Sequence, residues 1–365
     1  MDVASVRRVH QEDWTDEGVR FLRARDLVAF AKNEPVDDPL FISEEMYQEY
    51  SAQSGKVSMG DLLVTGVGTI GVPWLVTSEN PIYFKDGNII WFKNAGEIDG
   101  EFFYHSFTAS TIQNYINEAA GIGTVGTFTI ETGKKTPIWL PTKQEQRCVS
   151  AFMTRLDNLI TLHQRKHDQL AMLKKSLLDK MFPKPGSDVP ELRFAGFTEP
   201  WEQRKLGEVA PLQRGFDLPF SQMSPGPYPV VMSNGIGGWH SHYKVKGPGV
   251  VTGRSGTIGC LQYIEDNYWP HNTSLWVTSF TGNYPRFIYW LYASVGLERF
   301  SSGSGVPTLN RNDVHDYAIA LPRNLNEQLN IACLFTRLDN LITLHQRKRD
   351  QLATLKKSLL DKMFV

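Results

Sequence analysis

LDNLITLHQRKHDQLAMLKKSLLDKMF, residues 156–182, is the stretch that decides the fold, because the chain carries it twice. The second copy, LDNLITLHQRKRDQLATLKKSLLDKMF, occupies residues 338–364 and differs only where Arg349 replaces His167 and Thr354 replaces Met172. The period of about 180 residues is far longer than that of stacked repeat arrays, so it indicates duplication of a whole domain plus a helix. The sequence therefore predicts two similar halves.

Both copies are predicted to be long helices that pair with each other. Leucines recur at alternating steps of three and four residues, and polar residues such as His163 and His345 occupy the positions where a leucine is missing. These polar residues either fix the register of the helix pair or are simply exposed where the pairing is loose. Each helix begins after a Leu-Pro pair and has about 40 residues, or roughly 60 Å at 1.5 Å per residue. The predicted partner-binding residues on these seams are Leu156, Leu159, Leu170, Leu338, Leu341 and Leu352.

Weaker matches extend the duplication upstream of each helix. They are short, and outside them the halves differ almost everywhere, as expected if two similar frames carry two different contact surfaces. The matched segments are Val64–Gly71 with Val251–Gly259, in which Arg254 and Ser255 mark one insertion, Trp91 with Trp276, Gly121–Thr124 with Gly305–Thr308, and Leu140-Pro141 with Leu321-Pro322.

Composition is that of an ordinary globular protein with two or three domains in 365 residues. No apolar run approaches the roughly 18 residues of a membrane helix, and the N-terminus lacks the apolar core of a secretory signal, so a cytoplasmic location is expected. Cys148, Cys260 and Cys333 have no metal-site spacing and are predicted to be buried thiols; no metal or cofactor is expected. The net charge of -1 means that any affinity for nucleic acid comes from local patches or from partners.

Three motifs point towards enzymes but lack the required context. Residues 66–71 match GxGxxG and Asp86 follows, yet the next residues read as a strand instead of the helix that would hold a dinucleotide pyrophosphate. Residues 121–126 match as well but follow a helical stretch, so both glycine motifs are interpreted as turns or loops. Asn80-Pro81-Ile82-Tyr83 is close to the Asn-Pro-Pro-Tyr motif of amino-methyltransferases, but no adenosylmethionine-binding unit accompanies it.

A linker, Pro183–Pro190, follows the first helix. The order of Lys180–Pro183, then Val189–Phe197, then Trp201–Val209 resembles the junction in specificity subunits of type I restriction-modification systems, and the similarity covers nearly the whole chain. One departure is that the first half has no counterpart of Lys205–Val209 before Gly18–Arg23, so the first domain is predicted to be shortened at its N-terminus.

The resemblance implies an α/β (α+β) fold with two target-recognition domains, each with a mixed β-sheet, joined by two long antiparallel coiled-coil helices. It also implies that each domain reads one part of a bipartite double-stranded DNA target, that two methyltransferase subunits dock on the helices and adjoining surfaces, and that restriction subunits join this core and the partners supply all catalysis. The expected domains are residues 1–141 and 201–322 for target recognition, helices 142–182 and 323–365, and the linker 183–200.

Sequence-specific reading of DNA bases requires side chains with directional hydrogen-bond donors and acceptors, on elements that enter a groove of the duplex. The first candidate for DNA contact is residues 233–242, which are predicted to form a glycine-rich loop. The second is the Arg254-Ser255 insertion, where the alternative is that Arg254 only closes a turn at the surface. In the first half, arginines near a probable strand and two lysines in a turn either contact phosphates or are simply solvated. The predicted DNA-binding residues are Asn234, Trp239, His240, His242, Arg254, Ser255, Arg20, Arg23, Arg25, Lys134 and Lys135.

The mechanism expected from these features is that of a ruler, in which helix length fixes the unread spacer at no more than about 17 base pairs of 3.4 Å each. Two rival functions are a self-contained DNA methyltransferase or nuclease, and an antirestriction decoy that occupies methyltransferase subunits without reading DNA. His271–Thr273 and Thr308–Arg311 resemble family motifs that shape the recognition domain, and framework is favoured over base contact for both.

Overall fold

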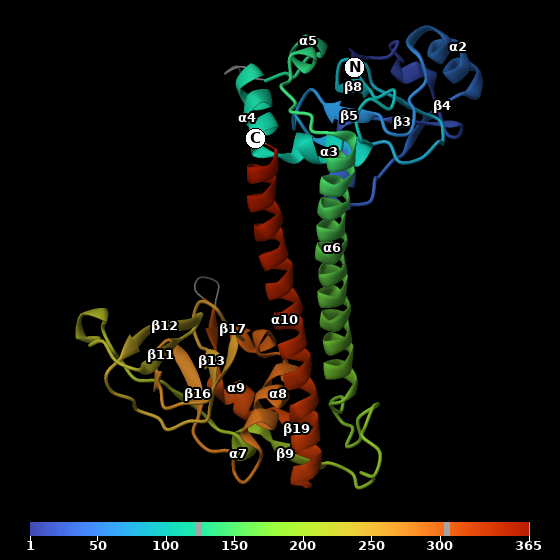
Figure 1. The fold of residues 1–365 in the computed structure, drawn as a ribbon. Coiled ribbons are helices and arrows are strands. Elements are labelled where there is room, and N and C mark those ends of the chain that lie inside the picture. Colours follow the sequence, from blue (N-terminus) through green and yellow to red (C-terminus); the bar gives the residue numbers. More distant parts are fainter. Residues whose placement is uncertain (121–125, 303–306, 365) are drawn as a thin grey trace. The chain divides into compact units, whose positions relative to one another are not determined.

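The structure is a computed structural model that describes residues 1–120, 126–302 and 307–364 (Figure 1). The chain divides into two compact units, of which unit 1 comprises residues 1–164 and 347–365 and unit 2 comprises residues 165–346. The two repeated segments lie in the helices α6 (Lys143–Lys180) and α10 (Leu325–Met363). Each unit therefore contains one part of each long helix, and each is described by itself.

Unit 1 has two four-stranded sheets. The sheet β1-β8-β5-β6 is antiparallel throughout, whereas β2-β4-β3-β7 is mixed, because β3 and β7 run parallel. The strands are β1 (Asp2–Ala4), β2 (Trp14–Thr15), β3 (Val19–Leu22), β4 (Leu40–Ile42), β5 (Leu62–Thr65), β6 (Pro73–Leu75), β7 (Ile82–Phe84) and β8 (Ile89–Lys93).

Helices close one face of the antiparallel sheet of unit 1. Phe92 of β8 meets Phe103 and Phe107 of α3 edge to face, and Met153 of α6 and Phe364, which follows α10, are buried in the same core. Burial of these large apolar side chains supplies the main driving force for folding of the unit. The helices are α1 (Ala24–Lys32), α2 (Glu44–Ser54), α3 (Gly100–Thr108), α4 (Ser110–Ala119) and α5 (Ile130–Lys134), with a 3₁₀ turn η1 (Gln11–Asp13).

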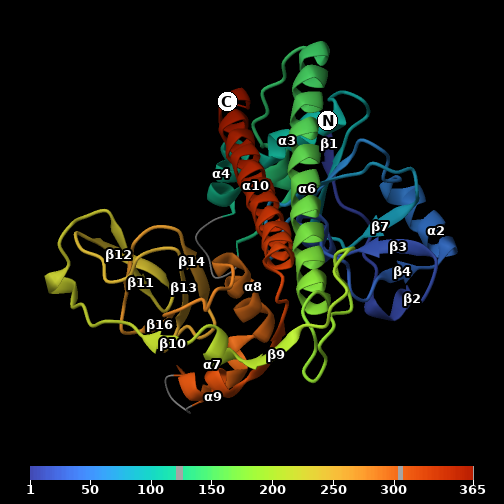
Figure 2. The ribbon, with the colours of Figure 1, turned by 90° about the horizontal axis from the view of Figure 1, so that it is seen from below.

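Unit 2 repeats this plan with one antiparallel and one mixed sheet, β10-β16-β13-β14 and β12-β11-β15, and β9 pairs separately with β19. In Figure 2 the β11 and β12 strands lie at the end of the unit away from α8 and α10. The strands are β9 (Glu202–Lys205), β10 (Leu212–Arg214), β11 (Tyr228–Met232), β12 (Gly235–His240), β13 (Gly249–Gly253), β14 (Leu261–Ile264), β15 (Trp269–Pro270), β16 (Ser274–Val277), β17 (Ser301–Ser302), β18 (Thr308–Leu309) and β19 (Ala318–Leu321).

The core of unit 2 is built around aromatic side chains from segments far apart in the sequence. Phe182, just after α6, stacks on Phe287 of α8 and contacts Trp201 and Phe335. The helices of the unit, besides its parts of α6 and α10, are α7 (Leu206–Val209), α8 (Pro285–Val295) and α9 (Arg311–Asp316), with 3₁₀ turns η2 (Phe220–Gln222) and η3 (Leu297–Phe300).

Strand register confirms one sequence match and corrects another. Trp91 faces Leu63 in β5, and Trp276 faces Val251 in β13, so the two tryptophans are equivalent. Counting along β5 and β13 then makes Gly253 the counterpart of Thr65 and places Arg254 where the first half has Gly66. The carbonyls of Gly66 and Arg254 accept equivalent hydrogen bonds, from the amides of Phe128 and Leu309 respectively. The predicted insertion at Arg254-Ser255 is therefore wrong, because the two glycine turns have the same length.

The second glycine match is also out of register. Val67 bridges Thr127 and its counterpart Ser255 bridges Thr308, so Thr308 corresponds to Thr127 instead of Thr124. Of the residues in this match, 121–124 and 305–306 lie outside the described residues. The turn at residues 66–71 leads into the strand β6, so the prediction that a strand, and not a phosphate-binding helix, follows this turn is confirmed.

The prediction of buried thiols is wrong for two of the three cysteines. Cys148 and Cys333 are exposed and Cys260 is half-buried, because the first two lie on the outer faces of the long helices. Within the described residues no cluster of His, Cys, Asp and Glu is arranged to hold a metal ion. The described helices also include none with the length and apolar character needed to span a membrane.

Candidate nucleic-acid interface and helix pair

The first candidate surface of unit 2 is a hairpin and not the predicted loop. Residues 228–240 form strands β11 and β12, joined by a turn at Ser233 and Asn234. Gly235 has a φ of 130°, which favours glycine, and a Cβ at Gly237 would lie 2.3 Å from the Met232 sulfur. The glycines therefore allow a tight two-stranded ribbon, and ribbons of this kind fit the major groove of DNA.

The hairpin turn and the Arg254 turn meet at Thr273. The Ser233 amide donates to Thr273 Oγ1 at 3.3 Å, and the Arg254 amide donates to the Thr273 carbonyl at 2.9 Å. The Arg254 guanidinium, which is half-buried, forms no hydrogen bond or ion pair with the part of the chain that the structure describes. The structure thus brings Asn234, Arg254 and Ser255 together, and among the described residues the Arg254 guanidinium has no hydrogen-bond or ion-pair partner that would prevent contact with a ligand.

The remaining candidates lie at the other end of β12. Trp239 is 55% exposed and His242 is exposed, about 16 Å from the turn at 3.3 Å per strand residue. His240 differs, because it is only 6% exposed, its Nδ1 accepts from the Ser224 amide at 3.1 Å, and its ring contacts Trp269. His240 is therefore a framework residue in this fold, which corrects its assignment to the reading surface.

In unit 1 the candidate arginines make mainly internal contacts. Arg23 forms hydrogen bonds with both carboxylate oxygens of buried Asp26 and donates to the Asp38 carbonyl at 2.8 Å. Arg20 donates to the Leu40 carbonyl at 3.3 Å, and burial lowers the pKa of its guanidinium. Arg23 thus fixes the segment before β4 and Arg20 contacts the first residue of β4, and Arg23 is corrected from a phosphate contact to a framework role.

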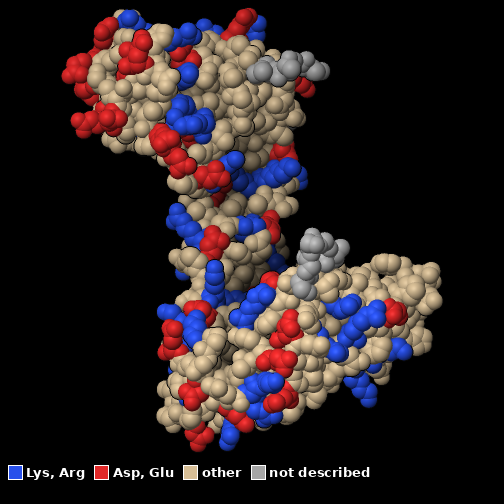
Figure 3. Space-filling view, turned by 180° about the vertical axis from the view of Figure 1, so that it is seen from behind, with Lys and Arg blue, Asp and Glu red and all other residues tan. Residues whose placement is uncertain are grey.

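The other basic candidates of unit 1 are on the surface. Arg25 has a side chain that is 62% exposed, beside Asp26. Lys134 is the last residue of the short helix α5 and Lys135 lies in the turn that follows, so the predicted turn is confirmed for Lys135 and wrong for Lys134. Lys135 pairs with Glu131 at 3.1 Å. Because α5 packs on β1 and β8 while α1, which carries Arg25, packs on β5 and β6, these side chains lie at opposite ends of the strand order of one antiparallel sheet. Basic and acidic side chains alternate on the face of each unit drawn in Figure 3.

Equivalent ion pairs join the long helices inside each unit. Lys356 Nζ lies 2.6 Å from Asp157 Oδ1 in unit 1, and Lys174 Nζ lies 2.6 Å from Asp339 Oδ1 in unit 2. In both units the paired segments come from α6 and α10. In each ion pair one copy of the repeated sequence therefore supplies the aspartate and the other copy supplies the lysine, and the same contact forms once in each unit.

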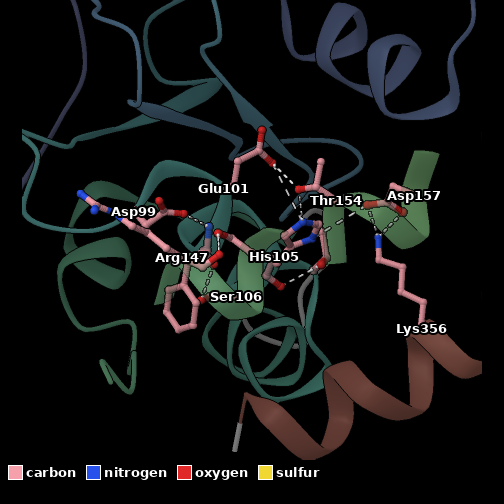
Figure 4. Close-up of polar contacts among 11 residues, drawn as sticks. Asp99, Glu101, His105, Ser106, Arg147, Thr154, Asp157 and Lys356 are labelled. Atoms are coloured by element: carbon pink, nitrogen blue, oxygen red, sulfur yellow. Dashed lines mark hydrogen bonds and ion pairs between the residues drawn. The ribbon is translucent and has the colours of Figure 1, made fainter. Parts of the chain in front are cut away.

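The residue that faces each ion pair from outside the two long helices differs between the units. In unit 2 Lys174 Nζ also lies 4.8 Å from the ring centre of Trp290, a cation–π contact. The equivalent residue in unit 1 is His105, which lies 4.0 Å from Asp157 and 3.3 Å from Thr154 Oγ1 (Figure 4). Burial, and then the positive charge of Lys356, lower the pKa of His105 to about 4. Sequence reasoning missed this site, because α3 and α8 share no recognisable motif.

The seam leucines are divided between core and surface. Leu156 and Leu338 are 5% and 6% exposed and belong to the cores of their units, so their assignment as binding residues for a partner subunit is corrected. The other predicted leucines Leu159, Leu170 and Leu352 are half-buried. Two pairs of leucines are exposed at matching positions of the two repeated segments, which the seam pattern did not predict. They are Leu162 with Leu344, at 49% and 44%, and Leu173 with Leu355, at 46% and 47%. Leu341 is 42% exposed, whereas its counterpart Leu159 is half-buried.

Comparisons with known proteins agree on one family. The family model described as "Type I restriction modification DNA specificity domain" matches residues 29–172 and again 198–354. A putative type I restriction enzyme specificity subunit of Haemophilus influenzae is 29% identical over 33% of this chain and 30% of its own length. The MjaIX specificity subunit of Methanocaldococcus jannaschii is 24% identical over 44% and 38%, respectively. The matches thus span about a third of each curated relative.

Solved structures share the fold across the whole chain. The S subunit of a type I restriction-modification system from M. genitalium aligns with a TM-score of 0.60 at 15% identity, over 100% of this chain and 93% of that one. A chain from a structure on assembly and conformational transition of the type I system aligns with a TM-score of 0.54 at 17% identity, over 94% and 90%. At 15% and 17% sequence identity, these alignments show a similarity of fold alone.

Proposed function

The chain belongs to the family of type I restriction-modification DNA specificity domains, and from this premise we propose that each of its units reads one part of a bipartite DNA target. The observation that carries the proposal is that two frames with equivalent strands and turns present different polar side chains. At the glycine turn, for example, unit 1 has Gly66 where unit 2 has Arg254. Equivalent frames with different contact groups suit the reading of two different half-sites.

Unit 2 would read its half-site through the β11–β12 hairpin and the adjoining turn. Arg254 suits a guanine edge or a phosphate, and Asn234 has the donor and acceptor that an adenine edge requires. Exposed Trp239 would lie against the sugar-phosphate backbone. In unit 1 the exposed basic residues Arg25 and Lys134 are the proposed phosphate contacts.

The long helices would carry the partner subunits. Leu162 and Leu173 on α6 match Leu344 and Leu355 on α10 in both sequence position and exposure, so the chain offers the same apolar groups twice. Two identical sites suit two copies of one methyltransferase subunit, and restriction subunits would join that core. The partners would supply the chemistry in the cytoplasm, and helix length would set the unread spacer between half-sites.

Methylation mapping tests the proposal directly. DNA from cells carrying the chain with its cognate methyltransferase should contain a bipartite adenine-methylated motif that is absent when the chain is deleted. If the chain binds methyltransferase but no motif depends on it, the decoy function is correct instead. If the purified chain methylates or cuts DNA alone, the assignment of catalysis to partners is wrong.

Substitution of Arg254 by alanine should relax the reading of one half-site only. Loss of a directional base contact costs about 1–3 kcal/mol of discrimination, so methylation should spread to sites with one altered base in the unit 2 half-site. Motif mapping measures this change, and the other half-site serves as the internal standard. Arg323→Ala, which removes an exposed arginine paired with Glu202, is the control and should leave the motif unchanged. An unchanged motif in Arg254→Ala would exclude base reading by Arg254.

A further inference from the structure

The segment that carries the β11–β12 hairpin of unit 2 is almost free of charge. Residues 215–243 contain one charged side chain, Asp217, and no lysine or arginine. Asp217 is paired with Arg214 at 3.1 Å, and the next basic residue, Lys244, is held over two aromatic rings. In unit 1, by contrast, residues 5–42, which include β2, β3 and β4, carry several basic and several acidic side chains. The hairpin of unit 2 therefore has no lysine or arginine of its own to neutralise a phosphate.

A β-bulge places two large apolar side chains on one face of this hairpin. Ile236 is opposite Val231 and Trp239 is opposite Pro229, and the register shifts between these two pairs. Because Val231 and Pro229 are two residues apart on β11, the side chains opposite them point to the same face. Without the bulge, Ile236 and Trp239 would point to opposite faces, since they are three residues apart. Their exposed fractions are 50% and 55%.

The opposite face of β12 is covered by methionine side chains. A Cβ at Gly237 would lie 2.3 Å from the Met232 sulfur. A Cβ at Gly238 would lie 3.2 Å from the Met223 sulfur. The methionines thus occupy the space beside the strand on that side, and the face that carries Ile236 is the open one.

We propose that Ile236 reads the C5-methyl group of a thymine in the half-site of unit 2. The inference rests on the proposed function, in which this hairpin enters the major groove. Phosphates and the polar edges of bases match charged or hydrogen-bonding side chains, whereas the apolar group that base edges present in that groove is the thymine methyl. An exposed isoleucine on an uncharged ribbon therefore matches this group.

The neighbouring side chains fit the same contact. Asn234 is exposed in the turn, two residues before Ile236, and its amide suits the adenine that pairs with the thymine. Trp239 lies on the same face as Ile236, about 7 Å farther along the strand, which is within the roughly 12 Å width of the major groove. The hairpin can therefore contact the methyl group and the adjoining backbone together.

Replacement of thymine by uracil tests the inference, because deoxyuridine keeps the base pair and removes only the methyl group. The full-length chain with its cognate methyltransferase would be titrated with duplexes that carry the mapped motif, in which each thymine is replaced in turn. We expect one replacement to weaken binding about fourfold, since a buried methyl group is worth about 0.8 kcal/mol. Ile236→Ala should weaken binding to the thymine duplex and remove the difference between thymine and uracil at that position.

Controls separate this inference from the proposed function. Ile236→Val keeps a branched apolar side chain and should keep most of the difference between thymine and uracil. Val189→Ala removes an apolar side chain of similar exposure, 49%, from the linker of the same unit and should leave DNA binding unaltered.

Three outcomes would overturn the inference. Specific binding in which no thymine depends on Ile236 would overturn it and leave the proposed function standing. Loss of the methyltransferase from the complex on Ile236→Ala, with the thymine dependence unchanged, would show that this face docks a protein instead. Binding of the motif no tighter than of unrelated DNA would overturn the proposed function as well.

Discussion

Replacement of Glu327 by alanine is expected to lower the free energy of unfolding by about 3–5 kcal/mol, which is the range for breaking a buried ion pair by removing one partner. Glu327 is 1% exposed and accepts from Arg193 through both carboxylate oxygens. This interaction also raises the pKa of Arg193, so the guanidinium stays charged at any working pH. The substitution would leave a charge that is 14% exposed without its counter-ion.

The loss would extend beyond the ion pair. The Trp201 indole, which is buried in the core of unit 2, donates to the same carboxylate and would lose its acceptor. An unsatisfied buried donor costs about 1–3 kcal/mol, and this cost is part of the range above because the two contacts share one group. Residues 193–209, which include Arg193, Trp201 and β9, would therefore loosen first, and exchange of the β9 and β19 amides should report this loosening.

Urea unfolding followed by circular dichroism measures the change, and the internal duplication provides the matched control. Glu145 is the equivalent position of unit 1, because its neighbour Gln146 repeats the hydrogen bonds of Gln328 with a proline carbonyl and with the amide at the start of a helix. Glu145 is exposed, so Glu145→Ala should change stability by no more than about 0.5 kcal/mol. Equal effects of the two substitutions would contradict the buried-pair account of Glu327.

The duplication and the long helices were predictable because they depend on local sequence. An almost identical repeat requires a duplicated unit, and its leucine spacing requires helices, so α6 and α10 lie where the sequence places them. The register of the glycine turn was not predictable in the same way. Matching Gly66 to Gly253 by residue identity produced an insertion, whereas the strand pairing makes Arg254 the counterpart of Gly66.

The contact surfaces were harder to predict because burial depends on residues distant in the chain. His240 looks like a surface imidazole beside glycines, and only the fold brings Ser224 and Trp269 against it. The sequence also gives no reason to distinguish Glu145 from Glu327, because the arginine that pairs with Glu327 lies 134 residues away. The half-buried Arg254, whose guanidinium has no partner among the described residues, and the exposed Trp239 are therefore stronger DNA-contact candidates than the buried His240.

Acidification below neutral pH is expected to destabilise unit 1 through His105. Burial and the facing Lys356 lower its pKa to about 4 in the folded chain, whereas an imidazole in the unfolded chain has a pKa of about 6.5. Above pH 7 the ring is neutral in both states and contributes no pH dependence. Between about pH 6.5 and 4 the unfolded chain binds a proton that the folded chain does not, so the free energy of unfolding falls as the pH falls. Below about pH 4 both states are protonated and the effect levels off.

Each unit of pKa difference corresponds to about 1.4 kcal/mol, so the loss should approach about 3 kcal/mol by pH 4. Carboxylates also lie near the ring, because Asp99 and Glu101 lie at the start of α3 and Asp157 lies on α6 (Figure 4). The measurement is therefore a difference between two urea-unfolding profiles, one for the unaltered chain and one for His105→Phe, which keeps a ring but cannot titrate. The variant should have a shallower slope between pH 6.5 and 4. Parallel profiles would show that His105 binds its proton equally well in both states, and that Lys356 does not oppose its charge.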